Sequence, residues 1–369
     1  MSTTRTYLFA GGGTGGHLTP GLAVAAELQR VDGTCRVLFA GSEREIERTM
    51  IASAGYEHVA LPVESLQTLR RNLFRFAWRN WRAWRQARAL MDQARPDAVI
   101  GLGGFASAPL VVAARRRRIP TIVLEQNSIP GKVNRWLGRG VDKVCLSLEE
   151  STAWFGCDCN TVITGNPVRQ AIASLAEIPT PPTMQKTLLV LGGSQGAVGL
   201  NEAVRGMVQS HVEQWRGRRI IHQTGPSQCD TLREFYAKHQ IDHQVAPFFE
   251  NVGELYREAR LVVSRAGATT LAELACAGRP AILVPFPAAA DNHQFHNARH
   301  YVDMGGAAIV TQQSDPEMTA RDLSTVVESL WDDAGRLTAL AEGMRAAARP
   351  EASRAVVRVL QTAIALRIN

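Results

Sequence analysis

The chain lacks the apolar segments that membrane insertion requires. No apolar run reaches the roughly 18 residues that a helix needs to cross a bilayer. No apolar leader segment precedes the first short apolar run, residues 7–10. We therefore expect a chain that is soluble, or at most peripheral to a membrane.

Metal-binding patterns are missing as well. The six cysteines are scattered, and the pair Cys157-x-Cys159 has no second pair at zinc spacing. No Asp-x-Asp motif occurs. This cysteine usage is typical of reduced thiols in a cytoplasmic protein. We expect no metal and no cofactor.

Two nucleotide-binding signatures are also absent. The pattern G-x-x-x-x-G-K-[ST] does not occur, which excludes a P-loop NTPase. A dinucleotide fold needs an acidic residue at the tip of its second strand. The expected second strand ends Leu38-Phe39-Ala40-Gly41-Ser42, with Glu43 only close by. A glycine turn in the first half is therefore expected to bind a phosphate that does not belong to NAD.

What is present is an ordinary globular composition with excess positive charge. The 369 residues are 45% apolar and 20% charged, which suits two domains that each bury a core. A net charge of +7 favours anionic partners, whether phosphate, nucleotide or anionic lipid. Nothing resembles a base-reading module, so nucleic acid is not an expected partner.

Short apolar runs alternate with segments of helical periodicity in both halves. In the first half, strands are expected at residues 7–10, 36–40, 58–61, 98–101, 121–124, 143–146 and 161–163, and helices at 21–31, 43–54, 69–94, 108–117 and 131–137. The pattern restarts beyond a proline-containing linker, with strands at 187–191, 219–223, 243–246, 260–264, 281–285 and 307–310 and a helix at 200–208. This alternation predicts an α/β fold of two Rossmann-like domains with parallel sheets.

The last helical stretch, residues 350–368, is too long to close only the second sheet. We expect it to cross back to the first domain. The predicted domains are therefore residues 1–168 with about 350–369, and residues 169–349.

A glycine turn followed by a histidine is the most distinctive stretch of the first half. Five of the residues 11–16 are glycine, and a helix is expected to follow. Bare N–H groups at a helix start attract an anion, usually a phosphate, although a tight turn without a ligand is the alternative. His17 at the helix start is either a catalytic base or a residue that binds a phosphate or caps the helix.

The second half contains a fuller nucleotide site. Residues 264–273 follow a strand and place small residues at a helix N-terminus, which suits a diphosphate. Glu273 lies about one helical turn after Thr269 and is either a ribose ligand or a capping-box glutamate. Ser194 is either a phosphate ligand or a turn serine. Residues 291–294 are either a sugar-binding cluster or an N-cap without a ligand.

Residues 70–88 contain seven arginines and no acidic residue, interleaved with aromatic side chains. On a helical wheel one side holds Leu73, Ala77, Trp81, Trp84 and Met91, and the opposite side holds Arg75, Arg79 and Arg82. The pattern predicts either an interfacial helix with a basic face, or a core helix whose arginines face solvent. Both can hold for different sides of one helix.

Six motifs occur in the order of the MurG family, the lipid I N-acetylglucosaminyltransferases of peptidoglycan synthesis. The chain resembles that family over essentially its whole length through Gly12-Gly13-Thr14-Gly15-Gly16-His17, Gly103-Gly104-Phe105-Ala106-Ser107-Ala108-Pro109, Glu125-Gln126-Asn127, Gly165-Asn166-Pro167-Val168-Arg169, Gly192-Gly193-Ser194-Gln195-Gly196-Ala197 and Ser264-Arg265-Ala266-Gly267-Ala268.

The resemblance implies a glycosyltransferase B fold, with two domains facing a cleft. It implies inverting transfer of N-acetylglucosamine from UDP-GlcNAc to the 4-hydroxyl of the muramyl sugar of lipid I, which gives lipid II. The expected location is peripheral, at the cytoplasmic face of the plasma (inner) membrane. Expected partners are UDP-GlcNAc, lipid I, an anionic membrane surface and other cell-wall synthesis proteins, and no obligatory metal or other cofactor is implied.

Site residues follow from the same resemblance. His17 matches the family's candidate base. The implied donor ligands are Thr14, Gly15, Gly16, Asn127, Arg169, Ser194, Phe249 through its backbone, Ala268, Thr269, Thr270, Leu271, Ala272, Glu273 and Gln294. The acceptor diphosphate is assigned to Gly12, Gly13, Gly103, Gly104 and Ser107. Membrane contact is assigned to Phe74, Trp78, Trp81, Arg82, Trp84 and Arg85.

Three departures from the family pattern stand out. Leu124 occupies the position of a histidine before Glu-Gln-Asn, so any role of that histidine is absent. Ser65-Leu66-Gln67 replaces a Ser-Gly-x-Arg stretch that touches the acceptor, and 288–290 is alanine where polar residues are common. Two other readings stay open: a transferase with a different acceptor, and a UDP-sugar-binding or membrane-scaffold protein without activity.

Overall fold

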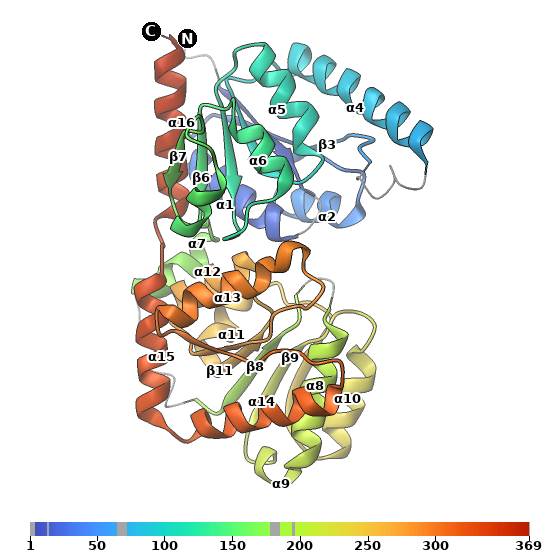
Figure 1. The fold of residues 1–369 in the computed structure, drawn as a ribbon, viewed down its shortest axis with the longest axis vertical. Coiled ribbons are helices and arrows are strands. Elements are labelled where there is room, and N and C mark those ends of the chain that lie inside the picture. The colour runs from blue at the N-terminus through green and yellow to red at the C-terminus, as the bar shows by residue number, and fades with distance from the viewer. Residues whose placement is uncertain (1–3, 13–14, 65–71, 178–184, 194–195, 369) are drawn as a thin grey trace. The chain divides into compact units, whose positions relative to one another are not determined.

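A computed structural model describes residues 4–12, 15–64, 72–177, 185–193 and 196–368, which fold into two compact units (Figure 1). Residues 1–169 and 351–369 form the first unit, and residues 170–350 form the second. These bounds differ by one residue from the division expected from the sequence.

The first unit is built on a seven-stranded parallel sheet in the order β3-β2-β1-β4-β5-β6-β7. Its strands are β1 (Thr6–Gly11), β2 (Arg36–Gly41), β3 (Glu57–Ala60), β4 (Ala98–Gly103), β5 (Thr121–Glu125), β6 (Lys143–Leu146) and β7 (Thr161–Ile163). Its helices are α1 (Gly15–Val31), α2 (Glu45–Ser53), α4 (Leu73–Ala94), α5 (Ser107–Arg116), α6 (Lys132–Gly138), the 3₁₀ helix η1 (Glu149–Trp154) and α16 (Ala352–Ile368).

The second unit repeats the design with a six-stranded parallel sheet in the order β10-β9-β8-β11-β12-β13. Its strands are β8 (Thr187–Leu191), β9 (Arg219–Gln223), β10 (Asp242–Ala246), β11 (Ala259–Ser264), β12 (Ala281–Leu283) and β13 (Ala307–Ile309). Its helices are α7 (Gln170–Ala173), η2 (Ser174–Glu177), α8 (Val198–Ser210), α9 (Val212–Trp215), α10 (Cys229–Lys238), α11 (Val252–Glu258), α12 (Ala268–Ala277), η4 (Ala290–Asn292), α13 (His293–Asp303), α14 (Pro316–Trp331) and α15 (Ala334–Ala347). The expected α/β class with two parallel sheets is confirmed.

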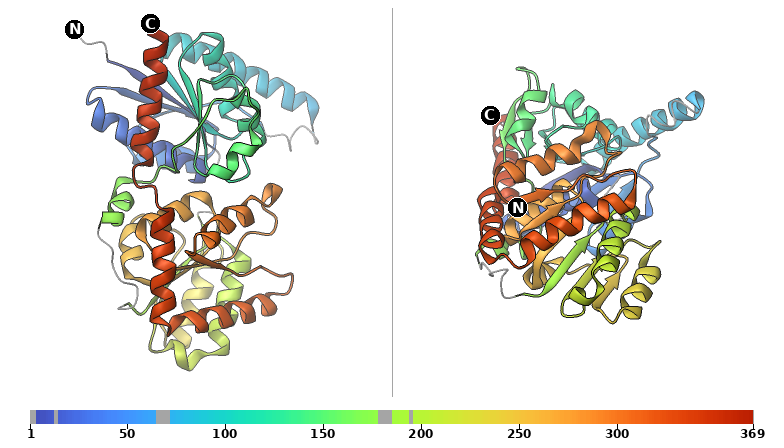
Figure 2. Two further views of the ribbon diagram at one scale, coloured as in Figure 1. Left: turned by 60° about the vertical axis from the view of Figure 1, so that its left-hand side comes forward. Right: turned by 60° about the horizontal axis from the view of Figure 1, so that its bottom comes forward.

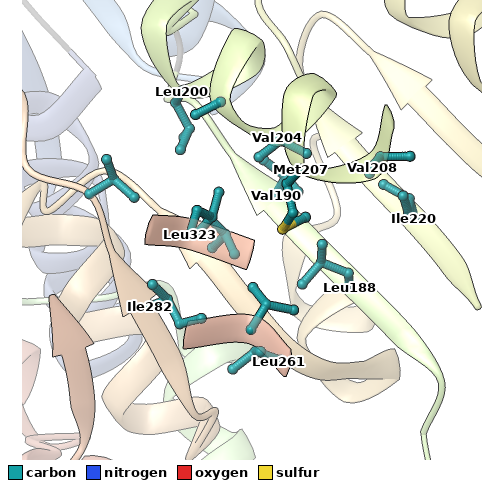
Figure 3. Packing of buried hydrophobic residues seen from close by; sticks show 14 of the residues in the cluster. Leu188, Val190, Leu200, Val204, Met207, Val208, Ile220, Leu261, Ile282 and Leu323 are labelled. Carbon is teal, nitrogen blue, oxygen red and sulfur yellow. The ribbon is translucent and has the colours of Figure 1, made fainter. Parts of the chain in front are cut away.

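The central strands of both sheets are buried on their two faces, which explains why β1, β4 and β8 are almost entirely runs of apolar and glycine residues. On β1, Tyr7 and Phe9 pack with α1 and α16, whereas Leu8 and Ala10 pack with α4 and α5. Successive side chains of a strand point to opposite faces, so one short run contributes to two cores. In the second unit, side chains of β8, β11 and β12 pack beneath α8 and α14 (Figure 3).

The C-terminal helix α16 belongs to the first unit, as expected. Val356, Val357 and Leu360 are buried in the same core as Leu18 and Leu28 of α1. Figure 2 shows α16 lying along this unit. The second unit is therefore inserted between two segments of the first.

Helix α1 begins earlier than expected, at Gly15 instead of Gly21, with Pro20 inside it. Pro20 is the sixth residue of this helix and is buried, and its missing N–H removes one backbone hydrogen-bond donor. His17 consequently lies in the first turn of α1. Within the described ranges, no helix is both long enough and apolar enough to cross a bilayer.

Candidate functional site

In each unit, the order of the strands brings the glycine turns together at one edge of the sheet. In the first sheet, successive strands are added outward from β1 in one direction and from β4 in the opposite direction, so the strand order reverses between β1 and β4. In the second sheet the same reversal lies between β8 and β11. Ligands of doubly wound sheets bind beyond the carboxyl ends of the strands at such a reversal. The loops after these four strands are the turns singled out from the sequence.

In the first unit, the loops after β1 and β4 touch each other. Gly11 pairs with Gly103, and their φ angles are 115° and 95°. A Cβ atom on Gly11 would lie 2.5 Å from the carbonyl oxygen of Gly103. One on Gly104 would lie 3.0 Å from the carbonyl oxygen of Gly12. The structure thus brings Gly12, Gly103 and Gly104 together, whereas Gly13 and Thr14 lie outside the described residues.

Ser107 serves the backbone of this loop. Its side chain is fully buried, and its hydroxyl donates a hydrogen bond to the carbonyl of Gly104 over 2.8 Å. The hydroxyl proton of Ser107 is therefore directed to the loop itself.

His17 is held by a neighbouring amide. Its Nδ1 lies 2.9 Å from Oε1 of Gln126, a residue that is 3% exposed and follows β5. The ring also lies against Gly103, where an added Cβ would be 3.2 Å from Nδ1. With Nδ1 engaged, Nε2 is the ring nitrogen that can take a proton from a ligand. The sequence motif contained Gln126, but its role was not assigned.

The segment after β5 is folded around a buried carboxylate. Glu125 is 1% exposed and accepts hydrogen bonds from the N–H of Asn127 at 2.9 Å, the N–H of Gly131 at 3.1 Å and Nδ2 of Asn134 at 2.8 Å. Neutral donors of this kind make burial of a carboxylate tolerable. Glu125 thereby sets the position of Asn127, which is half-buried.

A second buried carboxylate lies beside the first glycine turn. Glu47 of α2 is 1% exposed and accepts from both the N–H and the hydroxyl of Ser42. A Cβ on Gly12 would lie 2.5 Å from its Oε2. A carboxylate side chain therefore lies on the β2 side of this turn. Sequence reasoning missed Glu47, because only the fold brings α2 to this turn.

In the second unit, α12 presents an open N-terminus after β11. Its N-cap, Gly267, supplies no side-chain cap, and the first turn contains no acidic residue. The backbone N–H groups at the start of a helix and the helix dipole favour an anion there. Ala268, Thr269 and Thr270 form this first turn. Ser194, the expected companion in the loop after β8, lies outside the described residues.

A buried arginine adds positive charge close to this N-terminus. Arg265 is 8% exposed and donates to the carbonyl of Val284 at 2.9 Å and to Oε1 of Gln312 at 2.7 Å. Burial lowers the pKa of its guanidinium to about 10, so it remains charged at neutral pH. Arg265 belongs to one of the six sequence motifs, but the sequence alone predicted no role for its side chain.

Glu273 is the sixth residue of α12 and is 7% exposed. A capping-box glutamate sits at the third helical position, so that alternative is wrong for Glu273. The hydroxyl of Tyr256 in α11 donates to its Oε2 over 3.0 Å. Leu271 and Ala272, the two residues that precede Glu273, are buried.

Two further expected donor ligands, Phe249 and Gln294, are each held by a hydrogen bond between a backbone N–H and a glutamine side chain. The N–H of Phe249 donates to Oε1 of Gln223 at the end of β9 over 3.2 Å. Oε1 of Gln294, near the start of α13, accepts from the N–H of Phe286 over 3.0 Å. Asn292 occupies the N-cap position of α13, as one alternative expected, but its side chain makes no cap hydrogen bond there. Arg169, which is half-buried, is the last residue before the second unit begins.

Helix α4 differs from the wheel expectation. Leu73 and Met91 share one side of the wheel, yet Leu73 is 62% exposed and Met91 is 1% exposed. The cause is visible in Figure 2, where the N-terminal part of α4 projects beyond the sheet that covers its C-terminal part. The apolar side of α4 is therefore exposed to solvent at its N-terminal end and buried in the core at its C-terminal end.

The arginines of α4 are divided between two faces. Arg75 and Arg79, expected on a solvated basic face, form ion pairs with Glu64 at 3.1 Å, and Arg79 also pairs with Glu43. On the outward face, Arg82 lies 4.7 Å from the ring centre of Trp78, and Arg85 lies 5.0 Å from that of Trp81.

The aromatic side chains of this outward face are open to solvent. Phe74, Trp78 and Trp81 are 88%, 55% and 52% exposed, and a shallow groove is lined by Trp78, Trp81, Arg82, Arg85, Gln86 and Ala89. Trp84 is half-buried against the core. The outward face of α4 therefore presents exposed aromatic rings and arginine side chains next to one another.

No grouping of three or more His, Cys, Asp or Glu side chains that could hold a metal ion occurs among the residues that the structure describes.

Comparison with known proteins gives a consistent result over the whole chain. The model of the glycosyltransferase family 28 N-terminal domain matches residues 7–146, and that of the C-terminal domain matches residues 187–358. A protein of Geobacter sulfurreducens is 38% identical over 359 residues, covering 95% of this chain and 96% of its own. A protein of Desulfotalea psychrophila is 41% identical over 334 residues, covering 89% of both.

Both relatives are named UDP-N-acetylglucosamine–N-acetylmuramyl-(pentapeptide) pyrophosphoryl-undecaprenol N-acetylglucosamine transferase. Among solved structures, MurG of Acinetobacter baumannii matches with a TM-score of 0.74 and 29% identity, covering 97% of this chain and 99% of that one.

Proposed function

The chain belongs to glycosyltransferase family 28, and from this membership we propose that it transfers N-acetylglucosamine from UDP-GlcNAc to lipid I. The acceptor atom is the 4-hydroxyl of the muramyl sugar, and the product is the β-1,4-linked disaccharide lipid, lipid II. The observation that carries the proposal is the identity of 38% with a transferase of that name across 95% of the chain. Neither unit is missing from the match.

The donor is proposed to bind in the second unit at the β8/β11 reversal. The N-terminus of α12 faces the diphosphate, Glu273 accepts the ribose hydroxyls, and the backbone of Phe249 contacts uracil. Gln294 contacts the sugar, and Ser194 and Arg169 are further donor ligands. From the first unit we add Thr14, Gly15, Gly16 and Asn127. The open N-terminus of α12 supports this assignment, as does the buried carboxylate of Glu273.

The acceptor diphosphate is proposed to bind at Gly12, Gly13, Gly103 and Gly104, with Ser107 shaping the loop. Nε2 of His17 takes the proton of the 4-hydroxyl as its oxygen attacks C1 of the donor sugar. The bond between C1 and the diphosphate oxygen breaks, and UDP leaves with the electron pair. The dipole of α12 and the charge of Arg265 stabilise that leaving group, so we expect no obligatory metal.

Peripheral attachment to an anionic membrane surface is proposed for α4. The exposed Phe74, Trp78 and Trp81 supply apolar contact, and Arg82 and Arg85 supply positive charge beside them. A lipid-linked acceptor requires the enzyme to work at a membrane, and UDP-GlcNAc places that surface on the cytoplasmic side. Other cell-wall synthesis proteins at the same surface are proposed partners.

The test is release of UDP from UDP-GlcNAc by purified protein with a lipid I analogue. We expect UDP release that depends on the acceptor, together with a disaccharide product. Acceptor-independent release, or none, would refute the transferase. Competition with glycolipid acceptors that lack the muramyl peptide separates lipid I from another acceptor on the same fold.

A further inference from the structure

Tyr256 is a buried tyrosine that donates a hydrogen bond to Glu273, the carboxylate of the proposed ribose site. It lies in α11, is 1% exposed, and donates its hydroxyl to Oε2 of Glu273 over 3.0 Å. The ribose site proposed above depends on Glu273 and assigns nothing to Tyr256.

The contact restricts a side chain that would otherwise be mobile. A glutamate has three rotatable bonds, and ordering a long polar side chain opposes binding when it has to happen on ligand arrival. The Tyr256 side chain is 1% exposed, so the packing of the interior restricts the movement of its ring. A fixed donor on a fixed ring therefore holds the Glu273 carboxylate in one orientation before a ligand binds.

Helix α11 also links two parts of the donor site. It starts at Val252, three residues after Phe249, whose N–H is held by Gln223. Tyr256 follows one turn later and contacts α12 through Glu273. The spacing between the segment for the base and the carboxylate for the ribose is thereby set by one short helix.

We infer that Tyr256 is a positioning residue of the donor site, which orients Glu273 to accept the ribose hydroxyls of a uridine nucleotide. This inference rests on the proposed function. A carboxylate offers about four lone-pair positions, so the bond from Tyr256 is compatible with two further bonds from a ribose diol. Tyr256 itself need not touch the nucleotide.

The test is titration calorimetry of Tyr256→Phe with UDP and with 2′,3′-dideoxy-UDP. We expect the variant to bind UDP roughly three- to tenfold more weakly, in line with one lost hydrogen bond. Affinity for the dideoxy nucleotide should stay at the wild-type value, because it has no diol for Glu273 to accept. In turnover, the KM for UDP-GlcNAc should rise while kcat changes little.

Tyr236→Phe is the matched control. Tyr236 is another fully buried tyrosine of the second unit, and its hydroxyl lies 2.9 Å from Nδ1 of His222. The control should bind both nucleotides as wild type does. In a Glu273→Gln background, Tyr256→Phe should have no further effect on UDP affinity, because the residue acts through the carboxylate.

Two results would overturn the inference alone: unchanged UDP affinity in Tyr256→Phe, or an equal loss for UDP and the dideoxy nucleotide. An equal loss would mean that Tyr256 only maintains the fold. Wild-type protein that binds no UDP at all would instead refute the donor site of the proposed function, and the inference with it.

Discussion

The ring of His17 is held through its Nδ1, which leaves Nε2 for the proposed role of base. Its Nδ1 is engaged by Gln126, and the ring lies against the loop after β4. We expect His17→Ala to lower kcat by about 10²- to 10⁴-fold, the usual contribution of a positioned base, with little change in UDP affinity. Steady-state kinetics and UDP titration measure the two quantities separately.

The control for this prediction is His239→Ala. His239 lies on the second unit, where its ring packs on Phe235. It should leave kcat unchanged. A His17→Ala enzyme that turns over at the wild-type rate would remove His17 from the role of base.

His222 gives the second unit a pH-dependent stability. It is fully buried between Tyr236 and Asn201, and burial lowers its pKa from 6.5 to about 3. Below pH 6.5 the unfolded chain binds a proton that the folded chain does not, so folding loses stability as pH falls toward 3. The loss between pH 7.5 and pH 5 is about 2 kcal/mol from this group, at ~1.4 kcal/mol per pH unit.

Urea denaturation at the two pH values checks this expectation, with the second unit identified as the transition that UDP shifts to higher urea. His222→Asn lowers stability at both pH values because its contacts change. Its pH dependence, however, should be shallower by about 2 kcal/mol. Equal pH dependence in the two proteins would contradict the prediction.

The residues proposed to bind substrate stand in sequence motifs that indicate their chemistry, whereas the residues that contact and position them do not. His17, Glu273 and the glycine turns stand in motifs whose spacing already indicates phosphate or ribose chemistry. Gln126, Gln223 and Tyr256 do not, because each acts on a partner 17 or more positions away, as the separations of 109, 26 and 17 residues show. Such contacts depend on strand order, which periodicity does not specify.

At the scale of the element, α4 consists of a buried half and an exposed half, and the exposed half is the one proposed to contact a membrane. Its C-terminal half is core, while its N-terminal half carries exposed aromatics beside arginines. We expect the double substitution Trp78→Ala and Trp81→Ala to reduce binding to vesicles that contain anionic lipid several-fold. Both rings lose apolar contact with the bilayer, at roughly 25 cal/mol per Å². Co-sedimentation at low and high salt is the measurement.

Trp136→Ala is the control for α4. Trp136 lies on α6 of the same unit and is 57% exposed, so it tests whether any exposed tryptophan suffices. It should leave vesicle binding unchanged, and salt should weaken wild-type binding because arginines contribute. Wild-type binding that ignores anionic lipid would show that the outward face of α4 is not a membrane surface.

The wheel predicted a helix here but divided its faces wrongly. A wheel assumes that the environment is constant along the axis, whereas α4 passes from the core into solvent. It also cannot show that Glu43 and Glu64 meet Arg79 from elsewhere in the chain. The start of α1 was placed too late for a related reason, since the first two turns of the helix contribute Leu18 and Pro20 to the interior and such packing is not visible in the sequence.

At the scale of the whole molecule, the C-terminal helix stabilises the first unit. Leu360 of α16 is fully buried in the core that includes Phe9 and Leu28. Leu360→Ala should lower the unfolding free energy of the first unit by about 2–5 kcal/mol, as deletion of a buried side chain does. Chemical denaturation measures it, and the transition that UDP protects should not move.

Leu366→Ala is the matched control, because Leu366 is on the same helix but 73% exposed. It should change stability by less than about 0.5 kcal/mol. A shift of the UDP-protected transition in Leu360→Ala would mean that α16 supports the second unit instead.

Alternating periodicity was enough to predict two parallel sheets, because only crossover helices connect parallel neighbours. It did not specify that β1 lies between β2 and β4, or β8 between β9 and β11. Those neighbours decide which turns meet. Parallel strands end at one edge of their sheet, so the glycine motifs that follow β1 and β4 lie at that edge, and the pairing of Gly11 with Gly103 shows how closely they meet.

The insertion of the second unit has a consequence for biosynthesis. A ribosome produces residues 1–169 first, but α16 emerges only after all of the second unit. Until then the core that holds Leu18 and Leu28 of α1 lacks the side chains that α16 contributes, among them Leu360. The second unit, continuous in sequence, can fold before the first unit has received this helix. Folding of the first unit therefore ends only after synthesis of the second unit, and not with completion of the N-terminal sheet.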